Sequence, residues 1–393
     1  MCFLSGRSVE LVSRFQPFRI LDTTLREGEQ FAGAHFTRED RLWLAGALDR
    51  FGVDEIEVLS PVVSPSASED LSALLNLRLG AAVRVHCRCA AEDIESALMA
   101  GATGINLYMG ASPLLTRHSL GDFSSSQDAR VSEAVRLARS SGAFVRFSAE
   151  DAFRTPRARL MKILGAAAEA GVQRLGLPDT VGIATPNQVY RLVALVRRHF
   201  PGLGLEFHGH NDAGCAIANA MAALEAGAEC VDVTILGIGE RVGITSLSGF
   251  MARLYTIDPS LVSRYHLELL PEMDARLARL AGITIPFNQP LTAPTAFTHV
   301  AGVHAKAALS EPACYEPIDP SVVGRSRSFE VYSRLIGRHA VAHLVEDVLG
   351  RQIDADEARR VTLALKRAAE ARRLDAGAAA EVVRMALAST SEV

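Results

Sequence analysis

Short apolar runs alternate with longer amphipathic segments along most of the chain. Between residue 18 and about residue 240 one unit recurs: a short apolar run rich in β-branched residues, a polar or glycine-containing loop, and an Ala/Leu/Arg segment with helical periodicity. The predicted strands are residues 18–24, 53–60, 83–88, 105–109, 144–148, 174–177, 205–210 and 230–236. Strands that alternate with helices pair in parallel, and eight such units close on themselves. We therefore predict an α/β fold, a (β/α)8 TIM barrel.

The segments between these strands predict helices, several of which end at a glycine just before the next strand. They cover residues 38–51, 91–100, 129–141, 157–170, 186–200 and 216–226. After about residue 265 the alternation of strands and helices ends. Helices are then predicted at residues 267–281, 338–349, 354–370 and 376–388, with a Pro- and Thr-rich connection at 283–304. We predict three parts: an N-terminal extension at 1–17, the barrel at 18–265, and a lid with a smaller helical domain at 266–393.

Composition excludes several classes of protein. The chain has 393 residues, of which 49% are hydrophobic and 22% charged, so a large core is possible. A net charge of −4 gives no basic surface for nucleic acid. No stretch reaches the ~18 apolar residues of a membrane span. The six cysteines are scattered without a C-x-x-C pair, which suits a reducing compartment. We expect a cytoplasmic protein that binds neither nucleic acid nor membranes.

Polar residues gather where the predicted strands end. They are Asp22, Thr24, Arg26, Glu27, His86, Arg146, Ser148, Glu150, Asp179, Thr180, His208 and His210. Active sites of such barrels lie at the carboxyl ends of the strands. Soluble cores rarely keep so much polarity without a use. We therefore expect a functional site at this end of the barrel.

The sharpest local signal is a pair of histidines on the seventh predicted strand. His208 and His210 are two residues apart, so both side chains point to the same face. Imidazole pairs bind divalent ions such as Zn²⁺ or Mn²⁺, and Glu27 on the first strand offers a carboxylate as third ligand. Arg26 beside it suits a carboxylate or a developing oxyanion. The alternative is that one or both histidines are hydrogen-bonded structural residues.

Seven motifs, in this order, carry a family resemblance. They are DTTLREGEQF at 22–31, SPVVSPSASED at 60–70, RFSAED at 146–151, DTVGIATP at 179–186, EFHGHND at 206–212, LGIGERVGIT at 236–245 and AGVHAKA at 301–307. From about residue 18 to at least residue 335, the chain resembles homocitrate synthase, within the barrel enzymes that include isopropylmalate synthase, citramalate synthase and hydroxymethylglutaryl-CoA lyase. The resemblance implies an acyltransferase that uses a divalent metal (Mg, Mn or Zn) to condense acetyl-CoA with a 2-oxo acid and then hydrolyses the thioester.

The same resemblance implies the roles of individual residues. The metal is held by the two histidines and the carboxylate named above, and Arg26 lies beside the reacting oxygen. The base that deprotonates acetyl-CoA is His304, helped by Tyr315 and oriented by Glu150. In the related synthases a lid from the neighbouring subunit brings this histidine over the barrel mouth. We therefore expect a homodimer with His304 contributed across the interface.

The glycine-rich run after the eighth predicted strand lacks the G-x-G-x-x-G spacing of dinucleotide-binding proteins, and it ends a barrel strand. Nicotinamide binding is therefore not expected. By resemblance Gly237, Gly239 and Glu240 belong to the acyl-CoA side of the site. A tight turn that closes the barrel is a second interpretation, and both can hold together.

The end of the substrate remote from the carbonyl decides which 2-oxo acid fits. An anionic tail needs donors, and His86, Arg146, Ser148 and Thr180 resemble the set that binds the distal carboxylate of 2-oxoglutarate in lysine-pathway homocitrate synthases. Gln30 joins these expected substrate contacts. Burying an arginine beside an alkyl tail would leave its charge unpaired. We expect an anionic 2-oxo acid, 2-oxoglutarate first.

One position departs from the family pattern. An aspartate of those enzymes corresponds to Asn106 here, whereas the nearby acid Glu206 is retained. The change removes a negative charge near the substrate tail, which would weaken feedback inhibition by lysine or admit a more negative tail. The alternatives are 3-phosphonopyruvate, giving 2-phosphonomethylmalate in phosphonate antibiotic biosynthesis, and oxaloacetate. An acyl-CoA lyase or aldolase, and a catalytically inactive binding protein on the same scaffold, are rival classes.

Overall fold

The computed structural model describes residues 15, 17–119, 127–300, 302–330 and 333–388. The predicted extension at 1–17 lies outside these residues except for Phe15 and Pro17. The chain divides into two compact units, Met1–Thr292 and Ala293–Val393. Every helix in the described part of the chain falls short of the length and apolar character that crossing a membrane requires.

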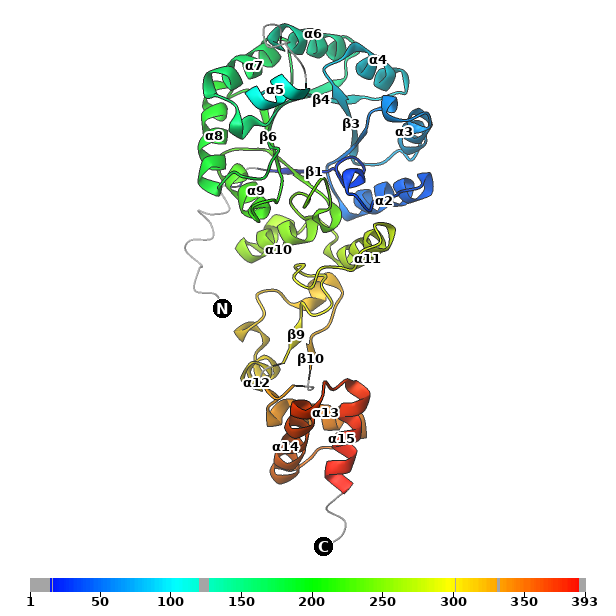
Figure 1. Ribbon diagram of the computed structural model, residues 1–393, viewed down its shortest axis with the longest axis vertical. Coiled ribbons are helices and arrows are strands. Elements are labelled where there is room, and N and C mark those ends of the chain that lie inside the picture. Colours follow the sequence, from blue (N-terminus) through cyan, green and yellow to red (C-terminus); the bar gives the residue numbers. More distant parts are fainter. Residues whose placement is uncertain (1–14, 16, 120–126, 301, 331–332, 389–393) are drawn as a thin grey trace. The chain divides into compact units, whose positions relative to one another are not determined.

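The first unit is a closed barrel of eight strands in chain order, with each strand parallel to its neighbours and β1 paired with β8. The strands are β1 Arg19–Asp22, β2 Glu55–Leu59, β3 Ala82–Arg88, β4 Gly104–Gly110, β5 Phe144–Glu150, β6 Arg174–Asp179, β7 Gly204–Gly209 and β8 Cys230–Val233. Figure 1 shows them as a ring with helices around its outside. The predicted α/β barrel is confirmed.

The helices of this unit follow the strands as expected from the alternating pattern. They are α2 Arg38–Phe51, α3 Ala67–Leu75, α4 Ala91–Met99, α5 Pro113–Ser119, α6 Gln127–Ser140, α7 Arg157–Glu169, α8 Pro186–His199, α9 Ala216–Glu225, α10 Leu247–Ile257 and α11 Leu270–Leu280. Capping boxes begin α2 at Thr37 and α8 at Thr185, where each threonine accepts a hydrogen bond from the N3 backbone. The helix ranges that the sequence pattern predicts do not include α3, α5 and α10.

Side chains alternate in kind along β2–β8, because successive residues of a strand point to opposite faces. Apolar residues such as Ile56, Leu107 and Phe147 are fully buried. The intervening positions carry buried charged or polar residues: Glu55, Glu57, Arg84, Arg146, Arg174, Glu206 and Asp232. Branched apolar residues usually fill a barrel of this kind. Here the interior is charged, so it must satisfy its charges by pairing.

The first unit extends beyond the boundary at residue 265 that the sequence pattern predicts. Arg276 on α11 donates to Asp40 on α2 at 3.0 Å. Asp274, also on α11, accepts hydrogen bonds from Ser248 on α10 and from Thr292. These contacts make α11 part of the barrel unit, although its sequence lies after the last strand–helix pair.

The second unit is helical with one short ribbon. Its elements are β9 Thr298–His299, α12 Gly302–Ser310, β10 Ser328–Phe329, α13 Arg338–Leu349, α14 Ala355–Ala371 and α15 Ala376–Ala388. β9 and β10 pair in parallel. Val341, Val361, Leu365 and Val383 are fully buried in a core of their own. The predicted helical C-terminal region is confirmed, and α12 replaces the end of the predicted connection at 283–304.

Candidate active site

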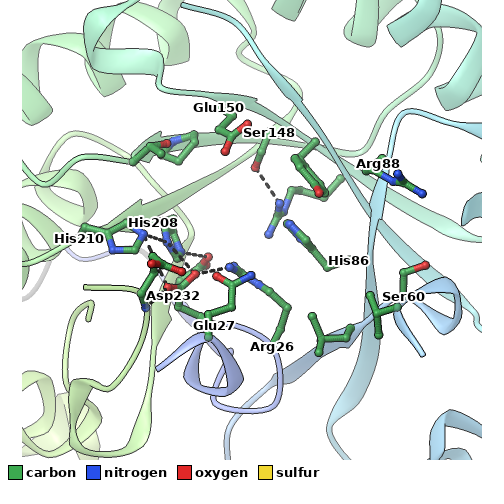
Figure 2. A pocket seen from close by; sticks show the side chains of 18 of the residues that line it. Arg26, Glu27, Ser60, His86, Arg88, Ser148, Glu150, His208, His210 and Asp232 are labelled. Carbon is green, nitrogen blue, oxygen red and sulfur yellow. Dashed lines mark hydrogen bonds and ion pairs between the residues drawn. The ribbon is translucent and has the colours of Figure 1, made fainter. Parts of the chain in front are cut away.

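A cavity of about 590 Å³ opens at the carboxyl end of the barrel strands. Its wall contains most of the candidate site residues that the sequence predicts. They are Arg26, Glu27, Gln30, His86, Arg146, Ser148, Glu150, Thr180, His208, His210 and Glu240. Figure 2 shows that His208, His210 and Glu27 gather on one side of this cavity, with Ser148 and Glu150 on another.

Glu27, His208 and His210 can hold a metal ion, since their ligand atoms all lie within 4.8 Å of one another. The two Nε2 atoms are 3.3 Å apart, and they lie 3.9 Å (His208) and 3.8 Å (His210) from oxygens of Glu27. Burial lowers the pKa of each histidine to about 4, so both are neutral near pH 7. Two neutral imidazole nitrogens facing one carboxylate are a donor set that fits a divalent ion.

Neighbouring charged residues keep the candidate ligands in the protonation states that bind a cation. Burial opposes ionisation of Glu27, but the positive charge of Arg26, followed by the two histidines, outweighs it and holds the Glu27 pKa at about 2. His208 Nδ1 lies 2.9 Å from Asp232 Oδ2. When Nδ1–H donates to Asp232, the lone pair of Nε2 faces the candidate metal position. Asp232 lies on β8 within the run Cys-Val-Asp-Val, where one acid between buried apolar residues was its only sequence signal.

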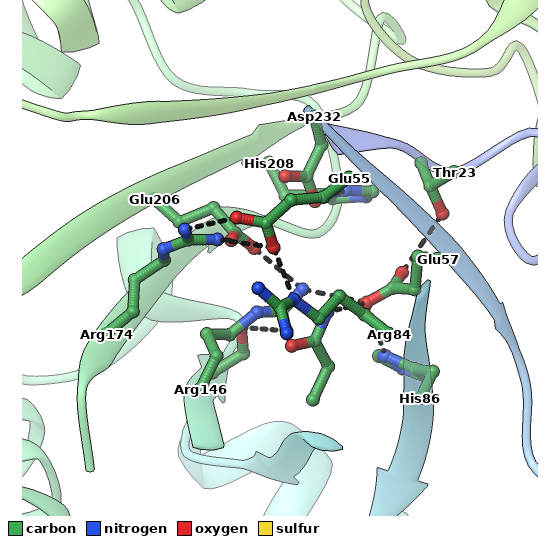
Figure 3. A network of polar contacts seen from close by, with 12 residues as sticks. Thr23, Glu55, Glu57, Arg84, His86, Arg146, Arg174, Glu206, His208 and Asp232 are labelled. Atoms are coloured by element: carbon green, nitrogen blue, oxygen red, sulfur yellow. Dashed lines mark hydrogen bonds and ion pairs between the residues drawn. The ribbon is translucent and has the colours of Figure 1, made fainter. Parts of the chain in front are cut away.

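Glu57 is an acceptor shared by several side chains of the polar network in the barrel (Figure 3). Its carboxylate accepts hydrogen bonds from Arg26 Nε at 2.6 Å, Arg146 Nη2 at 2.9 Å and Asn106 Nδ2 at 2.7 Å. His86 Nδ1 lies 3.2 Å from the same carboxylate. Burial raises the pKa of Glu57, but Arg26, His86 and Arg146 outweigh it and hold that pKa well below its usual range. Sequence reasoning missed this residue.

Arg146 is buried and reaches acids on two sides. Its Nη2 also lies 2.7 Å from Glu206 Oε1, and its Nη1 donates to Ser148 Oγ at 2.7 Å. Glu206 is shared with Arg174, whose Nη1 donates at 2.9 Å. Burial raises the pKa of Glu206 to about 7, and Arg146 lowers it only in part. Nε of Arg146 has no hydrogen-bond partner within the described ranges, and the residue lines the cavity.

The other residues predicted for the substrate site differ in how they lie relative to the cavity. Asn106 is fully buried behind the cavity wall, where its Oδ1 has no hydrogen-bond partner among the residues described. Thr180 Oγ1 accepts from the backbone N–H of Asp151 at 2.9 Å. The Glu150 carboxyl lines the cavity, and burial, followed by repulsion from Asp151, raises its pKa. Tyr108, which sequence reasoning missed, stacks on the His86 ring at 4.3 Å between centroids.

His304 and Tyr315 lie in the second unit. Their ring centroids are 4.2 Å apart, and Tyr315 is 44% exposed. His304 lies on α12. The two rings lie close together, and the roles of His304, Tyr315 and Glu150 remain predictions.

Comparisons with known proteins define the class. The HMGL-like family model matches residues 17–274, and the model described as homocitrate synthase post-HMGL domain-like matches residues 291–373. The Bacillus subtilis HMG-CoA lyase structure is 21% identical, with a TM-score of 0.63, and the match covers 69% of this chain and 96% of that one. At this identity the likeness supports the fold alone. The fold and the site therefore define a barrel enzyme of the HMGL-like class.

Relatives in sequence show to which family within this class the chain belongs. The cytosolic homocitrate synthase isozyme of Saccharomyces cerevisiae is 40% identical over 93% of this chain and 85% of its own length. The mitochondrial homocitrate synthase of Penicillium rubens is 44% identical over 84% of this chain and 70% of its own length. A probable 2-isopropylmalate synthase of Methanopyrus kandleri is 39% identical over 84% and 66%. The chain belongs to the homocitrate synthase family and is an acyltransferase of that type.

Proposed function

We propose that this enzyme condenses acetyl-CoA with an anionic 2-oxo acid, 2-oxoglutarate first, and releases homocitrate and coenzyme A. The observation that carries the proposal is a buried arginine, Arg146, on the same cavity as the candidate metal ligands Glu27, His208 and His210. One end of the cavity suits a chelated keto acid, and the other suits an anionic tail. The homocitrate synthases among its sequence relatives support this substrate.

The reaction forms a bond between the acetyl methyl carbon and the keto carbon, and water then cleaves the thioester. A divalent ion (Mg²⁺, Mn²⁺ or Zn²⁺) bound by Glu27, His208 and His210 would supply Lewis-acid polarisation of the keto oxygen. Arg26 donates to Glu57 and to Glu27, so its guanidinium is fixed beside this position. Its permanent charge stabilises the oxyanion that develops as the carbon–carbon bond forms.

The acetyl methyl group must lose a proton before it attacks. His304 is the proposed base, because a positioned imidazole nitrogen can accept the proton that the methyl group loses. Tyr315 assists from its position beside the His304 ring. Glu150, on the cavity wall, is proposed to fix the tautomer. On the acyl-CoA side we place the loop that carries Gly237, Gly239 and Glu240.

The substrate tail is proposed to bind at Arg146, Ser148, His86, Thr180 and Gln30. These side chains offer hydrogen-bond donors to an anionic tail, and donors buried against an alkyl tail would gain no partner from it. Arg146 is also held by Glu57 and Glu206 at 2.9 and 2.7 Å. A bound tail therefore competes with two carboxylates.

A second candidate substrate is 3-phosphonopyruvate, which would give 2-phosphonomethylmalate. The observation that favours it is Asn106, whose neutral amide lies 2.7 Å from Glu57. A carboxylate at this position would add negative charge beside Glu57. Its replacement by an amide therefore favours a tail more negative than a carboxylate, such as a phosphonate. Oxaloacetate is a shorter dicarboxylic alternative.

The test is release of free thiol from acetyl-CoA by the purified enzyme, with Mg²⁺, Mn²⁺ or Zn²⁺ and each of the three oxo acids. Highest kcat/KM with 2-oxoglutarate supports homocitrate synthesis. Highest kcat/KM with 3-phosphonopyruvate assigns the second function, and Asn106→Asp should then shift preference back toward 2-oxoglutarate. Equal inertness toward all three acids, with every metal, contradicts the proposal.

A further inference from the structure

The glycine-rich loop between β8 and α10, residues 236–243, is folded on itself. Gly237 and Gly243 have φ values of 71° and 78°, in the left-handed region that glycine favours. A Cβ on Gly243 would lie 1.8 Å from the carbonyl oxygen of Gly237. The Ile244 N–H donates to that same oxygen at 3.0 Å. These two glycines therefore fix the shape of the loop.

One side of this loop contacts the carboxylate of Glu27. The backbone N–H of Glu240 donates to Glu27 Oε1 at 2.8 Å. A Cβ on Gly239 would lie 2.8 Å from the same oxygen and 2.9 Å from Cγ of Glu27. Arg26 donates to the other oxygen, Oε2. The carboxylate is thus held on both oxygens, and it packs against a position where only a glycine leaves room for it.

The loop is in turn tied to neighbouring loops of the barrel mouth. Arg241 donates to the two carboxylate oxygens of Asp212, at 2.8 and 3.0 Å, and to the carbonyl oxygen of Thr180 at 2.8 Å. The backbone of Asn211, the residue after His210, donates to the carbonyl oxygen of Gly243 at 2.9 Å. The loop after β8 is therefore fastened to the loops after β6 and β7.

We infer that residues 236–243 position the metal ligand Glu27, and that Gly239 and the Glu240 peptide N–H set the affinity of the site for its ion. Such contacts orient a ligand before the metal binds, and their loss typically weakens affinity by about 10–100-fold. Gly239 and Arg241 are then positioning residues. The inference rests on the proposed metal site. It gives this loop a role in metal binding in addition to its proposed contact with acyl-CoA.

The test measures Mn²⁺ binding to metal-free enzyme by electron paramagnetic resonance of the free ion, with no substrate present. Gly239→Ala should weaken Mn²⁺ binding about 10–100-fold, because the added methyl group displaces the Glu27 carboxylate. The control is Gly202→Ala, since a Cβ there meets open space and Mn²⁺ affinity should not change. Unchanged Mn²⁺ affinity in Gly239→Ala, with weaker acetyl-CoA binding, would overturn the inference.

A double-mutant cycle shows whether Gly239 acts through Glu27. In a Glu27→Ala background, Gly239→Ala should cause no further loss of Mn²⁺ affinity, and an equal further loss would contradict the inference. Parental affinity in Glu27→Ala alone would remove the proposed metal site itself. If Gly239→Ala does not fold, Arg241→Lys provides the second measurement, because it keeps the positive charge near His210 and loses the paired contact to Asp212. It should weaken Mn²⁺ binding without altering the glycines, and unchanged affinity would again count against the loop.

Discussion

Glu57 joins the two ends of the candidate site, since Arg26 and Arg146 both donate to its carboxylate. We predict that Glu57→Gln lowers the free energy of unfolding by about 3–5 kcal/mol, because breaking a buried ion pair leaves its partners uncompensated. We also expect kcat/KM to fall about 100-fold, since both arginines lose the group that positions them. Urea unfolding followed by circular dichroism, together with thiol release, measures the two effects.

The matched control for this prediction is Glu268→Gln. Glu268 pairs with His266 at 2.9 Å on the surface, with 55% of the Glu268 side chain exposed. Such pairs contribute less than about 1 kcal/mol. A loss in Glu57→Gln no greater than in this control would show that the network around Glu57 does not stabilise the barrel.

The positions lining the cavity could be predicted because parallel strands end at the same rim. His208 and His210 follow from the two-residue period of a strand, and Arg26 and Glu27 follow from the first strand end. Glu57 and Asp232 could not be assigned in this way. An acid that alternates with apolar residues in a strand normally indicates a solvent-facing side, and only closure of the barrel turns that side inward.

Among the helices of the first unit, α11 carries a buried acid, Asp274, outside the cavity. Burial raises the pKa of Asp274 to about 6, and hydrogen bonds from Thr292 and Ser248 offset this only in part. A carboxyl group whose pKa is higher in the folded state binds more protons when folded than when unfolded. Its contribution to stability is therefore complete below about pH 4 and is lost as pH rises through 6.

We predict that Asp274→Asn removes about 3 kcal/mol of pH dependence between pH 4 and pH 6, the free energy of a two-unit shift in pKa. The amide keeps the oxygen that Thr292 and Ser248 use. Urea unfolding at closely spaced pH values, for the parent and the variant, gives the difference. Asp356→Asn on α14, where the aspartate is exposed, should leave the pH curve unchanged. Parallel curves for the parent and Asp274→Asn would contradict the prediction.

Helices with a clear apolar stripe were predicted within a few residues, as for α2, α8 and α14. Segments whose sequence favours loops were not. The run that forms α3 is preceded by serine and proline, which are typical of turns. Packing against the barrel, rather than local propensity, stabilises such short helices. The first unit likewise ends after α11 because of tertiary contacts that no local pattern reveals.

At the scale of the whole molecule, the candidate site residues belong to two different compact units. The candidate metal ligands lie in the first unit, and His304 and Tyr315 lie in the second. In the proposed reaction His304 is the base, so the proposal requires this residue to reach the acetyl methyl group. Homodimers are the commonest symmetric assembly and allow the two units of one site to come from different chains.

We predict that two inactive variants complement each other when mixed. Glu27→Gln disables the first unit, and His304→Ala disables the second. If His304 crosses between subunits, a heterodimer pairs the intact first unit of one chain with the intact second unit of the other. Random mixing at equal amounts should then restore about a quarter of the parental active sites in a symmetric dimer.

The variants must be denatured and refolded together, or co-expressed, so that subunits exchange. Thiol release from acetyl-CoA then reports activity, and light scattering reports the oligomeric state. If each chain instead supplies its own His304, every active site contains one defect and the mixture stays inactive. A fully active parent enzyme that is monomeric would also contradict the prediction that His304 comes from the partner subunit. Because each variant keeps one unit intact, restored turnover can come only from the sharing of units between chains.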